Sequence, residues 1–488
     1  MEKLTGHWRR WALLGVLSAA ALAALAVGCG GMMSAEGLGA TPGGAQDIGL
    51  ARELIEMGQV PRVDQFTVEG LYSEHDLTLA EAAPCDEPLC LGHALGLEVA
   101  LDDDQRDLFV QLGLSTNVAA ADFSRQPLNL GIVVDTSGSM TAYHDGVKQA
   151  LHALVDVLNE DDRVALVVFE ATARTIQSST PASDLQTLHD AVDRLQTGGS
   201  TNMEAGMRLG YAEIAEHVDA EHLSRLIVFT DAMTNTGDTA AGSFNALTQA
   251  AAAIDIGFTF FGFGEYFDAE FIDSLAHLRG GNYRFVRAED VKPIFEEELD
   301  YLVTPIAYDL RVQLEAAEGA QLLSVYGIPQ AAEHFDGELF DVSTLFLSKR
   351  KGAIVLRFEG AELEALYQGA RLGVGQASIS YQTVDGEDKR ATLDLSAALA
   401  ALPGEGEVHY PDAAMQRTLA VTDMYLAMYA VCADYHGGGF DLEDAGARLD
   451  AAIAKLRAAD ELLEDDRLRR EIALLEQLKL NLGLAPTE

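Results

Sequence analysis

Strict alternation of apolar and polar residues occurs in two separate parts of the chain. Before residue 128, it places Leu95, Leu97, Val99 and Leu101 on one face of a strand and Leu108, Val110, Leu112 and Leu114 on one face of the next. After a break at 303–305 it returns at 310–314, 354–358 and 377–381, and 385–386 supplies an Asp-Gly hairpin turn. A period of two is typical of antiparallel strands with one buried face. We expect the strands of 48–126 and 304–403 to pack together as one β-sandwich.

Longer apolar runs dominate the segment between these two parts, residues 127–303. Apolar runs lie at 128–134, 163–169, 226–230, 258–263 and 283–286, and amphipathic stretches lie near 146–158, 203–217, 244–254, 269–278 and 291–302. Buried strands that alternate with helices predict an α/β unit with a doubly wound sheet. We expect this unit to be inserted into the sandwich, so that the order of domains along the chain differs from their order in space.

A helical period replaces the alternation in residues 411–488. Residues 415–435 form one candidate helix, which the sequence His-Gly-Gly-Gly at 436–439 would end. Two further apolar stripes follow, one at Leu442, Leu449, Ile453 and Leu456 and one at Leu468, Ile472, Leu475 and Leu482. We expect these C-terminal helices to pack on the sandwich or on each other, because the periodic runs are short for an extended coiled coil. Partner binding through a coiled coil is the alternative.

The N-terminus has the pattern of a secretion signal. Lys3, Arg9 and Arg10 precede an apolar stretch at 11–27, and Gly28 and Cys29 follow it. Residues 26–29 resemble a bacterial lipobox, which implies cleavage after residue 28 and lipidation of Cys29; an ordinary signal peptide with a chance cysteine is the alternative. By the same resemblance, Gly30 favours the outer membrane. Residues 29–47 are rich in small residues and are predicted to be a flexible tether.

Two further cysteines are close in sequence. Cys85 and Cys90 have prolines beside them and are separated by four residues, which is not the spacing of a zinc-binding pair. In an oxidising envelope compartment, a small disulfide-closed loop is the expected arrangement. Cys432 stands in an apolar helical context and is predicted to be a buried thiol.

Oxygen-bearing side chains follow two of the apolar runs of the α/β unit and begin one of its helices. Asp135, Ser137 and Ser139 come directly after the run at 128–134, Thr201 lies in a glycine-rich loop before the helix at 203–217, and Asp231 ends the run at 226–230. The carboxyl ends of the strands in such a sheet form a ligand-binding crevice. Oxygen ligands suit a hard divalent cation. Helix capping is the alternative explanation for each residue taken alone. It does not readily explain why oxygen-bearing side chains occur in three separate loops.

This order of residues resembles the von Willebrand factor type A domain. The motif of that family is D-x-S-x-S, then a threonine in a later loop, then an aspartate after the fourth strand. The resemblance assigns Asp135, Ser137, Ser139, Thr201 and Asp231 to a metal-ion-dependent adhesion site, in which an open coordination position accepts an acidic group from a partner. Ala232 stands where many relatives have glycine, a departure that removes no ligand. Residues 51–77 also resemble the segment that precedes this domain in a family of bacterial lipoproteins.

Composition and charge exclude several classes of function. The formal net charge of −44 at pH 7 should repel nucleic acid and anionic lipid. Ser139 and His144 are close in sequence, but no nucleophile-elbow motif surrounds them. The glycine-rich loop lacks the lysine of a phosphate-binding P-loop, and the twelve histidines form no H-E-x-x-H motif. We therefore expect a binding protein rather than an enzyme.

Together these features predict a lipid-anchored protein of the bacterial cell envelope that binds a divalent cation and an acidic side chain of a protein partner. Mg²⁺ is the expected cation, with Mn²⁺ and Ca²⁺ as alternatives. Two other functions stay open: an envelope scaffold in which the metal stabilises the fold, and an assembly factor that works with an ATPase of the AAA family.

Overall fold

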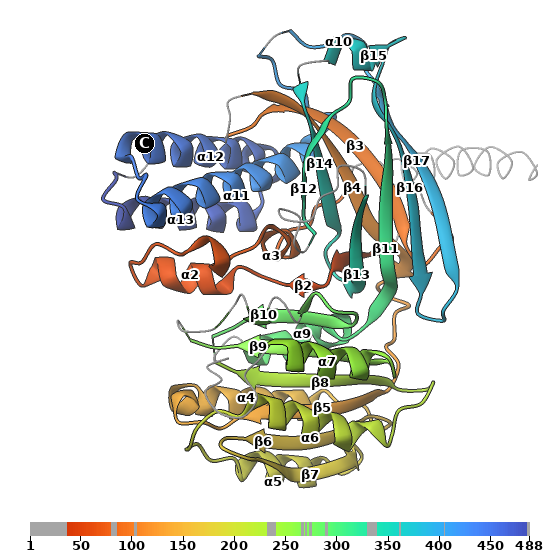
Figure 1. Cartoon of the computed structure of the whole chain (residues 1–488), viewed down its shortest axis with the longest axis vertical. Helices are drawn as coiled ribbons and strands as arrows, with labels where there is room; N and C mark the ends of the chain where they lie inside the picture. The colour runs from red at the N-terminus through yellow and green to blue at the C-terminus, as the bar shows by residue number, and fades with distance from the viewer. Residues whose placement is uncertain are drawn as a thin grey trace, which may run out of the picture.

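The computed structural model describes residues 37–79, 85–101, 105–231, 241–264, 268, 271–272, 276–287, 291–328, 339–360, 363–404 and 406–485. The predicted signal sequence at 1–28 and Cys29 lie outside the described residues, as does Ala232. The chain forms an α/β unit at one end, a large curved sheet at the other, and a layer of helices beside that sheet (Figure 1).

A seven-stranded sheet forms the centre of the α/β unit, in the order β2-β10-β9-β8-β5-β6-β7. Neighbouring strands are parallel except β6 and β7. All eight residues of β5 are buried, including the polar Asn129 and Asp135, as its mainly apolar sequence predicts. The strands are β2 (Gly44–Ala45), β5 (Leu128–Asp135), β6 (Arg163–Phe169), β7 (Ala173–Pro181), β8 (Leu223–Thr230), β9 (Ile256–Gly262) and β10 (Gly281–Phe285).

Helices cover both faces of this sheet, which confirms the predicted doubly wound fold. One face packs against α4 (His144–Asp156), α5 (Leu185–Asp193) and α9 (Val291–Leu302). The other packs against α6 (Met203–Ala215) and α7 (Ala241–Ala252). Neighbouring residues of β5 alternate between the two cores: Ile132 and Val134 join the first and Val133 joins the second.

The two regions of strict alternation combine, as expected, but in the described part of the chain they form one ten-stranded sheet and not the two facing sheets of a β-sandwich. It curves around a single core that takes Leu95, Leu97 and Leu112 from before the α/β unit and Leu310 and Ile379 from after it. Nε2 of His93 lies 3.1 Å from the carbonyl oxygen of Ser396, so β3 and β17 approach each other across the curve. The strands are β1 (Gly37–Pro42), β3 (Cys90–Val99), β4 (Arg106–Ala119), β11 (Pro305–Ala316), β12 (Leu322–Tyr326), β13 (Leu339–Ser348), β14 (Gly352–Phe358), β15 (Tyr367–Gln368), β16 (Arg371–Thr383) and β17 (Asp388–Ala398), with a short helix α10 (Leu363–Leu366).

The prediction of a flexible tether was wrong for residues 37–47. Strand β1 lies between β4 and β13 in the ten-stranded sheet, and β2 pairs with β10 in the other sheet. The small residues allow close backbone contact: a Cβ on Gly39 would lie 1.9 Å from the carbonyl oxygen of Arg350, and one on Gly37 would lie 2.3 Å from that of Thr116. These glycines therefore serve tight packing rather than flexibility.

The helical layer packs on the outer face of the ten-stranded sheet. Its core includes Phe109, Tyr326 and Val355 from the sheet, so the C-terminal helices contact both the sheet and each other. Among the described helices, none combines the length and the apolar character that crossing a membrane requires. The layer consists of α2 (Gly49–Glu56), a 3-10 turn η1 (Val63–Gln65), α3 (Val68–Ser73), α11 (Ala413–Gly437), α12 (Leu442–Leu463) and α13 (Asp466–Asn481).

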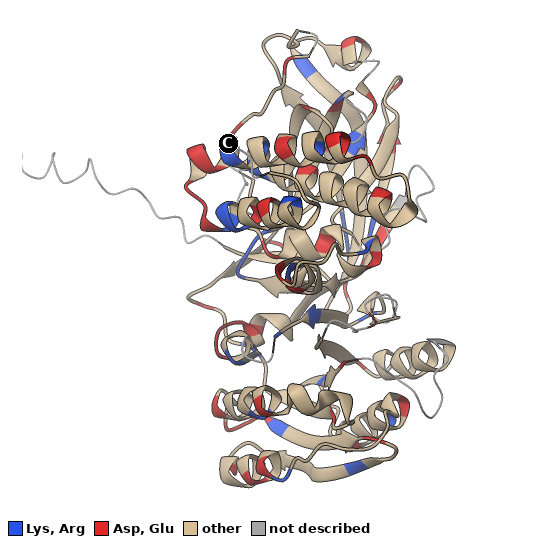
Figure 2. Cartoon of the chain, turned by 90° about the vertical axis from the view of Figure 1, so that its left-hand side faces the viewer, with Lys and Arg blue, Asp and Glu red and all other residues tan. Residues whose placement is uncertain are grey.

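Two cysteines at the start of β3 are joined, one just before the strand and one as its first residue. Cys85 and Cys90 form a disulfide with a Cα–Cα distance of 5.8 Å, and Cys432 is a buried free thiol in α11. Acidic residues occur in both the α/β unit and the helical layer (Figure 2).

Candidate metal centre

Asp135 is the last residue of β5, and its buried carboxylate is held on both oxygens. Oδ1 accepts a 2.9 Å hydrogen bond from the backbone N–H of Ser137, and Oδ2 accepts a 2.9 Å hydrogen bond from the hydroxyl of Thr230. Thr230 ends the neighbouring parallel strand β8. The carboxylate orientation is therefore fixed by its own turn and by the adjacent strand.

The two serines of the turn lie side by side. Their Oγ atoms are 3.1 Å apart. Ser137 is buried, whereas Ser139, the first residue of a short 3-10 turn η2 (Ser139–Ala142), is exposed. The site is thus closed toward the sheet and open toward solvent on the side of Ser139.

Backbone hydrogen bonds hold the glycine-rich loop against this turn. The N–H of Gly138 donates to the carbonyl oxygen of Gly199 at 3.2 Å, and the N–H of Gly198 donates to that of Thr136 at 2.7 Å. Thr201 is buried immediately before Asn202, whose side chain accepts a hydrogen bond from the N–H of Ala205 and so caps helix α6. The loop thereby brings Thr201 to the same edge of the sheet as Asp135.

Asp231 directly follows β8 and is buried close enough to Asp135 for the two charges to interact. Burial raises the pKa of the Asp135 carboxyl to about 6, hydrogen bonds from Ser137 and Thr230 oppose the rise, and the charge of Asp231 adds to it. Two buried carboxylates are costly unless a cation is shared between them, because each disfavours ionisation of the other. A divalent ion would remove this penalty.

The donor set fits a hard divalent cation. Two carboxylates and three hydroxyls supply oxygen only, which suits Mg²⁺, Mn²⁺ or Ca²⁺ better than a soft metal. Among the described residues, no group of three or more His, Cys, Asp and Glu side chains could hold a metal, so a site here depends on the hydroxyl ligands.

Sequence reasoning did not single out the residues that support this edge. Thr230 fixes Asp135, and the carbonyl oxygen of Glu170 accepts a hydrogen bond of 2.8 Å from the N–H of Asn202 at the start of α6. The hydroxyl of Thr136 donates a hydrogen bond of 3.0 Å to the carbonyl oxygen of Phe169, the last residue of the neighbouring strand β6. For these supporting residues, the sequence offered one indication, which is that Thr230 stands directly before Asp231.

Comparisons with known proteins identify a family for the α/β unit that contains this site. Residues 129–297 match the family model of the von Willebrand factor type A domain. The chain is 25% identical to YfbK of Escherichia coli over 276 residues, which cover 54% of this chain and 47% of that protein. It is 28% identical to sll0103 of Synechocystis over 180 residues, which cover 36% of this chain and 42% of that protein. The chain thus spans less than half the length of either relative.

The fold has a solved counterpart. A structure described as von Willebrand factor type A from Catenulispora acidiphila aligns with 80% of this chain and 91% of its own, with a TM-score of 0.51 and 16% sequence identity. Because this alignment covers more of the chain than residues 129–297, the likeness in fold includes elements outside the α/β unit.

Proposed function

We propose that the von Willebrand factor type A domain of this chain, residues 129–297, binds a divalent cation and through it an acidic side chain of a protein partner. The observation that carries the proposal is the convergence of three loops at the carboxyl edge of one sheet, with two buried acids and three hydroxyls. Mg²⁺ is the proposed cation, because oxygen ligands of this kind suit a small hard ion.

Four of the five residues would hold the metal from the buried side, and the fifth would lie where the metal is accessible to solvent. Ser137, Thr201 and the two aspartates are buried and would hold the ion from the sheet side. Ser139 is exposed at the mouth of the site, where a coordination position can face solvent. A partner carboxylate would supply the remaining negative charge and oxygen ligand at that position.

We further propose a binding role without catalysis. The hydroxyl of Ser139 faces that of Ser137 at 3.1 Å, an arrangement suited to two neighbouring ligands of one ion. A nucleophilic serine would instead need a general base within hydrogen-bond reach.

The proposed location is the bacterial cell envelope, with Cys29 lipidated and the protein anchored to the outer membrane. Three features support it: the basic and apolar residues at 1–27, the lipobox-like residues 26–29, and the disulfide between Cys85 and Cys90, which suits an oxidising compartment. The high negative charge argues against contact with nucleic acid or directly with anionic lipid.

The first test is calorimetry with MgCl₂ on the protein lacking residues 1–29, compared with Asp135→Ala. Asp190→Ala is the matched control, because Asp190 is an exposed acid of α5 in the same domain. We expect saturable binding in the parent and the control and none in Asp135→Ala. Equal heats in all three proteins would mean that Mg²⁺ binds only the diffuse acidic surface and would contradict the proposal.

A second measurement separates partner binding from a structural role of the metal. Capture of an envelope protein should require Mg²⁺, persist in Asp190→Ala and be lost in Asp135→Ala while the variant still unfolds cooperatively. If Asp135→Ala instead lost cooperative unfolding, the metal would act as a structural element of a scaffold. Association with an AAA-family ATPase would identify the partner class as assembly machinery.

A further inference from the structure

A large cleft lies where the type A domain meets the helical layer, and none of the proposed metal ligands lines it. Its volume is about 650 Å³, and its walls come from β10 and the residues after it, α9, α2, α13 and the turn between β13 and β14. This volume lies within the range of small-molecule sites. The cleft is thus built from segments that are far apart in sequence.

The charged lining of this cleft is unusual for such an acidic protein. The whole chain has 33 lysines and arginines against 77 acids. In the cleft the two signs are nearly balanced, and every cation is an arginine: the charged lining residues are Arg52, Arg284, Arg287, Arg350, Arg467 and Arg470 with Asp47, Glu56, Glu74, Glu297 and Glu298. Arginine is the cation whose planar donors match phosphate and carboxylate oxygens in pairs.

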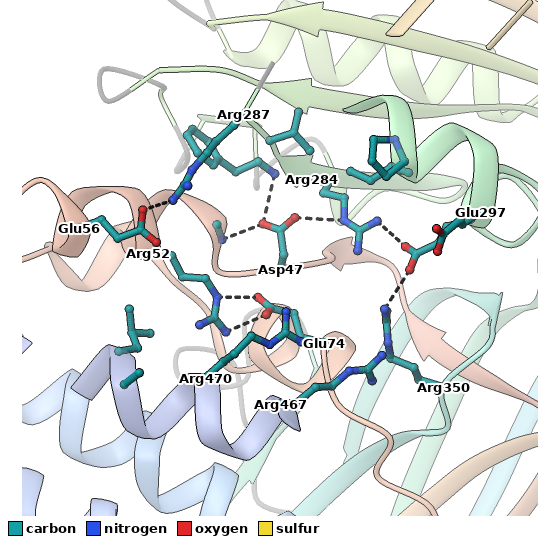
Figure 3. Close-up of a pocket in the computed structure, with 18 of the residues that line it drawn as sticks. Asp47, Arg52, Glu56, Glu74, Arg284, Arg287, Glu297, Arg350, Arg467 and Arg470 are labelled. Carbon is teal, nitrogen blue, oxygen red and sulfur yellow. Dashed lines mark hydrogen bonds and ion pairs between the residues drawn. The ribbon is translucent and has the colours of Figure 1, made fainter. Parts of the chain in front are cut away.

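Three of these arginines are fully engaged by acids. Arg52 contacts Glu74 and Glu471, each at 2.7 Å. Arg284 contacts Asp47 at 3.1 Å and Glu298 at 2.6 Å, and Arg287 contacts Glu56. These pairs join the type A domain to the N-terminal segment and the helical layer, and they account for much of the acidic lining (Figure 3).

The arginines along the α13 side are not matched in this way. Arg350 shares Glu298 with Arg284, at 2.9 Å, and its Nε is buried without a hydrogen-bond partner. Arg467 and Arg470, both on α13, have no ion pair with any acid among the residues that the structure describes. Figure 3 shows the three side chains along one side of the cleft.

The guanidinium group of Arg467 is repelled by those of Arg350 and Arg470. Burial lowers the pKa of Arg467, and the charges of Arg350 and Arg470 lower it further, whereas Asp465 and Asp76 oppose the change. Like charges held together at a partly buried position are unfavourable unless an anion compensates them. The cleft therefore has an excess of positive charge on one wall, although the chain as a whole is strongly negative.

We propose that this cleft binds a small soluble phosphate-bearing anion between Arg350, Arg467 and Arg470. The cleft is large enough for a small organic phosphate, and three arginines on one wall provide more donors than a monovalent carboxylate can use. The bound anion would join the type A domain and the helical layer, because Arg350 contacts Glu298 of α9 and the other two arginines belong to α13. This site is separate from the metal centre and does not depend on it.

The test is calorimetry with inorganic phosphate and pyrophosphate on the protein lacking residues 1–29. The buffers are freed of Mg²⁺ beforehand, because Mg²⁺ would bind pyrophosphate. A chelating resin is used for this step, because a soluble chelator is a polyanion and would compete for the arginines. The variant is the double change Arg467→Gln and Arg470→Gln, at one half-buried and one exposed position. The matched control is Arg469→Gln, because Arg469 lies on the same helix but pairs with Asp460 and Asp466 outside the cleft.

We expect saturable binding of pyrophosphate by the parent, at least tenfold weaker binding by the double variant, and unchanged binding by Arg469→Gln. Weaker binding at higher salt should accompany this pattern. Absence of saturable binding to the parent, or equal weakening in the control and the double variant, would overturn the proposal. Asp135→Ala should bind pyrophosphate like the parent, so failure of the metal site and failure of this site are distinguishable.

Discussion

Thr230 and Asp135 end two neighbouring parallel strands and are joined by a hydrogen bond of 2.9 Å from the threonine hydroxyl to carboxylate Oδ2. The bond couples the two strand ends that carry the acids of the proposed metal centre, because Asp231 is the next residue after Thr230. The orientation of Asp135 thus depends on a residue outside the metal-binding motif.

Replacing Thr230 by valine should weaken Mg²⁺ binding about tenfold, the lower end of the effect of removing a group that orients a metal ligand. Valine keeps the shape of the side chain and removes only the hydroxyl. Thr248→Val is the control, because Thr248 is equally buried but donates to the carbonyl oxygen of Phe244 within α7. Calorimetry on both variants checks the prediction, and equal affinities in the two would contradict it.

Gly199→Ala should destabilise the loop that carries Thr201 by about 1–2 kcal/mol, the cost of a left-handed backbone conformation for a residue with a Cβ. Gly199 has φ +87°, and a Cβ there would lie 2.5 Å from Oε2 of Glu170. Mg²⁺ affinity should fall as well. Gly242→Ala in α7, with open space around the new Cβ, should leave both properties near the parent values. Chemical denaturation and calorimetry measure the two effects, and a stable Gly199→Ala protein with full affinity would be the contrary result.

Asp423 should make the folded protein less stable as pH rises. Burial raises the pKa of its carboxyl to about 7, Lys455 opposes the rise, and Glu98 adds to it. Because this pKa lies above the ordinary value of 3.8, the group's contribution to stability is complete below about pH 3.8 and is lost as pH rises toward about 7. The slope is at most about 1.4 kcal/mol per pH unit for one proton.

Asp423→Asn removes this titration. The free energy of unfolding of the variant should therefore rise relative to that of the parent as pH increases from 5 to 8. Denaturant unfolding of both proteins at several pH values gives the difference directly. Lys455 also contacts Glu98 at 2.9 Å, so the lysine keeps an acidic partner in the variant. Parallel pH profiles for the two proteins would refute the assignment to Asp423.

The disulfide should contribute about 2 kcal/mol, the loop-entropy value for a short closed loop. The double variant Cys85→Ser and Cys90→Ser should lose this amount in denaturant unfolding. Alkylation offers an independent check on the protein lacking residues 1–29. Unfolded protein without reductant should be modified on Cys432 alone and, after reduction, on all three cysteines; modification of all three before reduction would disprove the bond.

Much of the type A domain could be predicted because its strands are continuous apolar runs with few alternatives. The expected run at 163–169 is strand β6, and the expected helix at 291–302 is α9. The edge strand β7 was missed because it has no continuous apolar run. It contains partly exposed polar residues such as Thr175 and Gln177 and has no clear apolar face.

The common edge of the proposed metal ligands could be predicted because four of them lie at or just after strand ends and Thr201 precedes helix α6, whereas the cleft could not. Arg52, Arg284 and Arg467 come from three distant segments, and no local pattern places them together. The N-terminal strands were missed because small residues indicate both flexibility and close contact. The close approach of Gly39 to Arg350 and of Gly37 to Thr116 in the folded protein distinguishes the two.

Strand β1 also determines how the protein would carry a mechanical load. Antiparallel pairing on both sides means that a pull on Gly37 along the strand acts on its hydrogen bonds to β4 and β13 together, in shear, rather than one after another. The same short segment continues into β2, at the edge of the sheet that carries the metal centre. Tension between Gly37 and a partner held at the proposed metal site would therefore pass from the ten-stranded sheet into the seven-stranded sheet, and the close packing of Gly37 and Gly39 within β1 would contribute to the resistance of this connection to rupture.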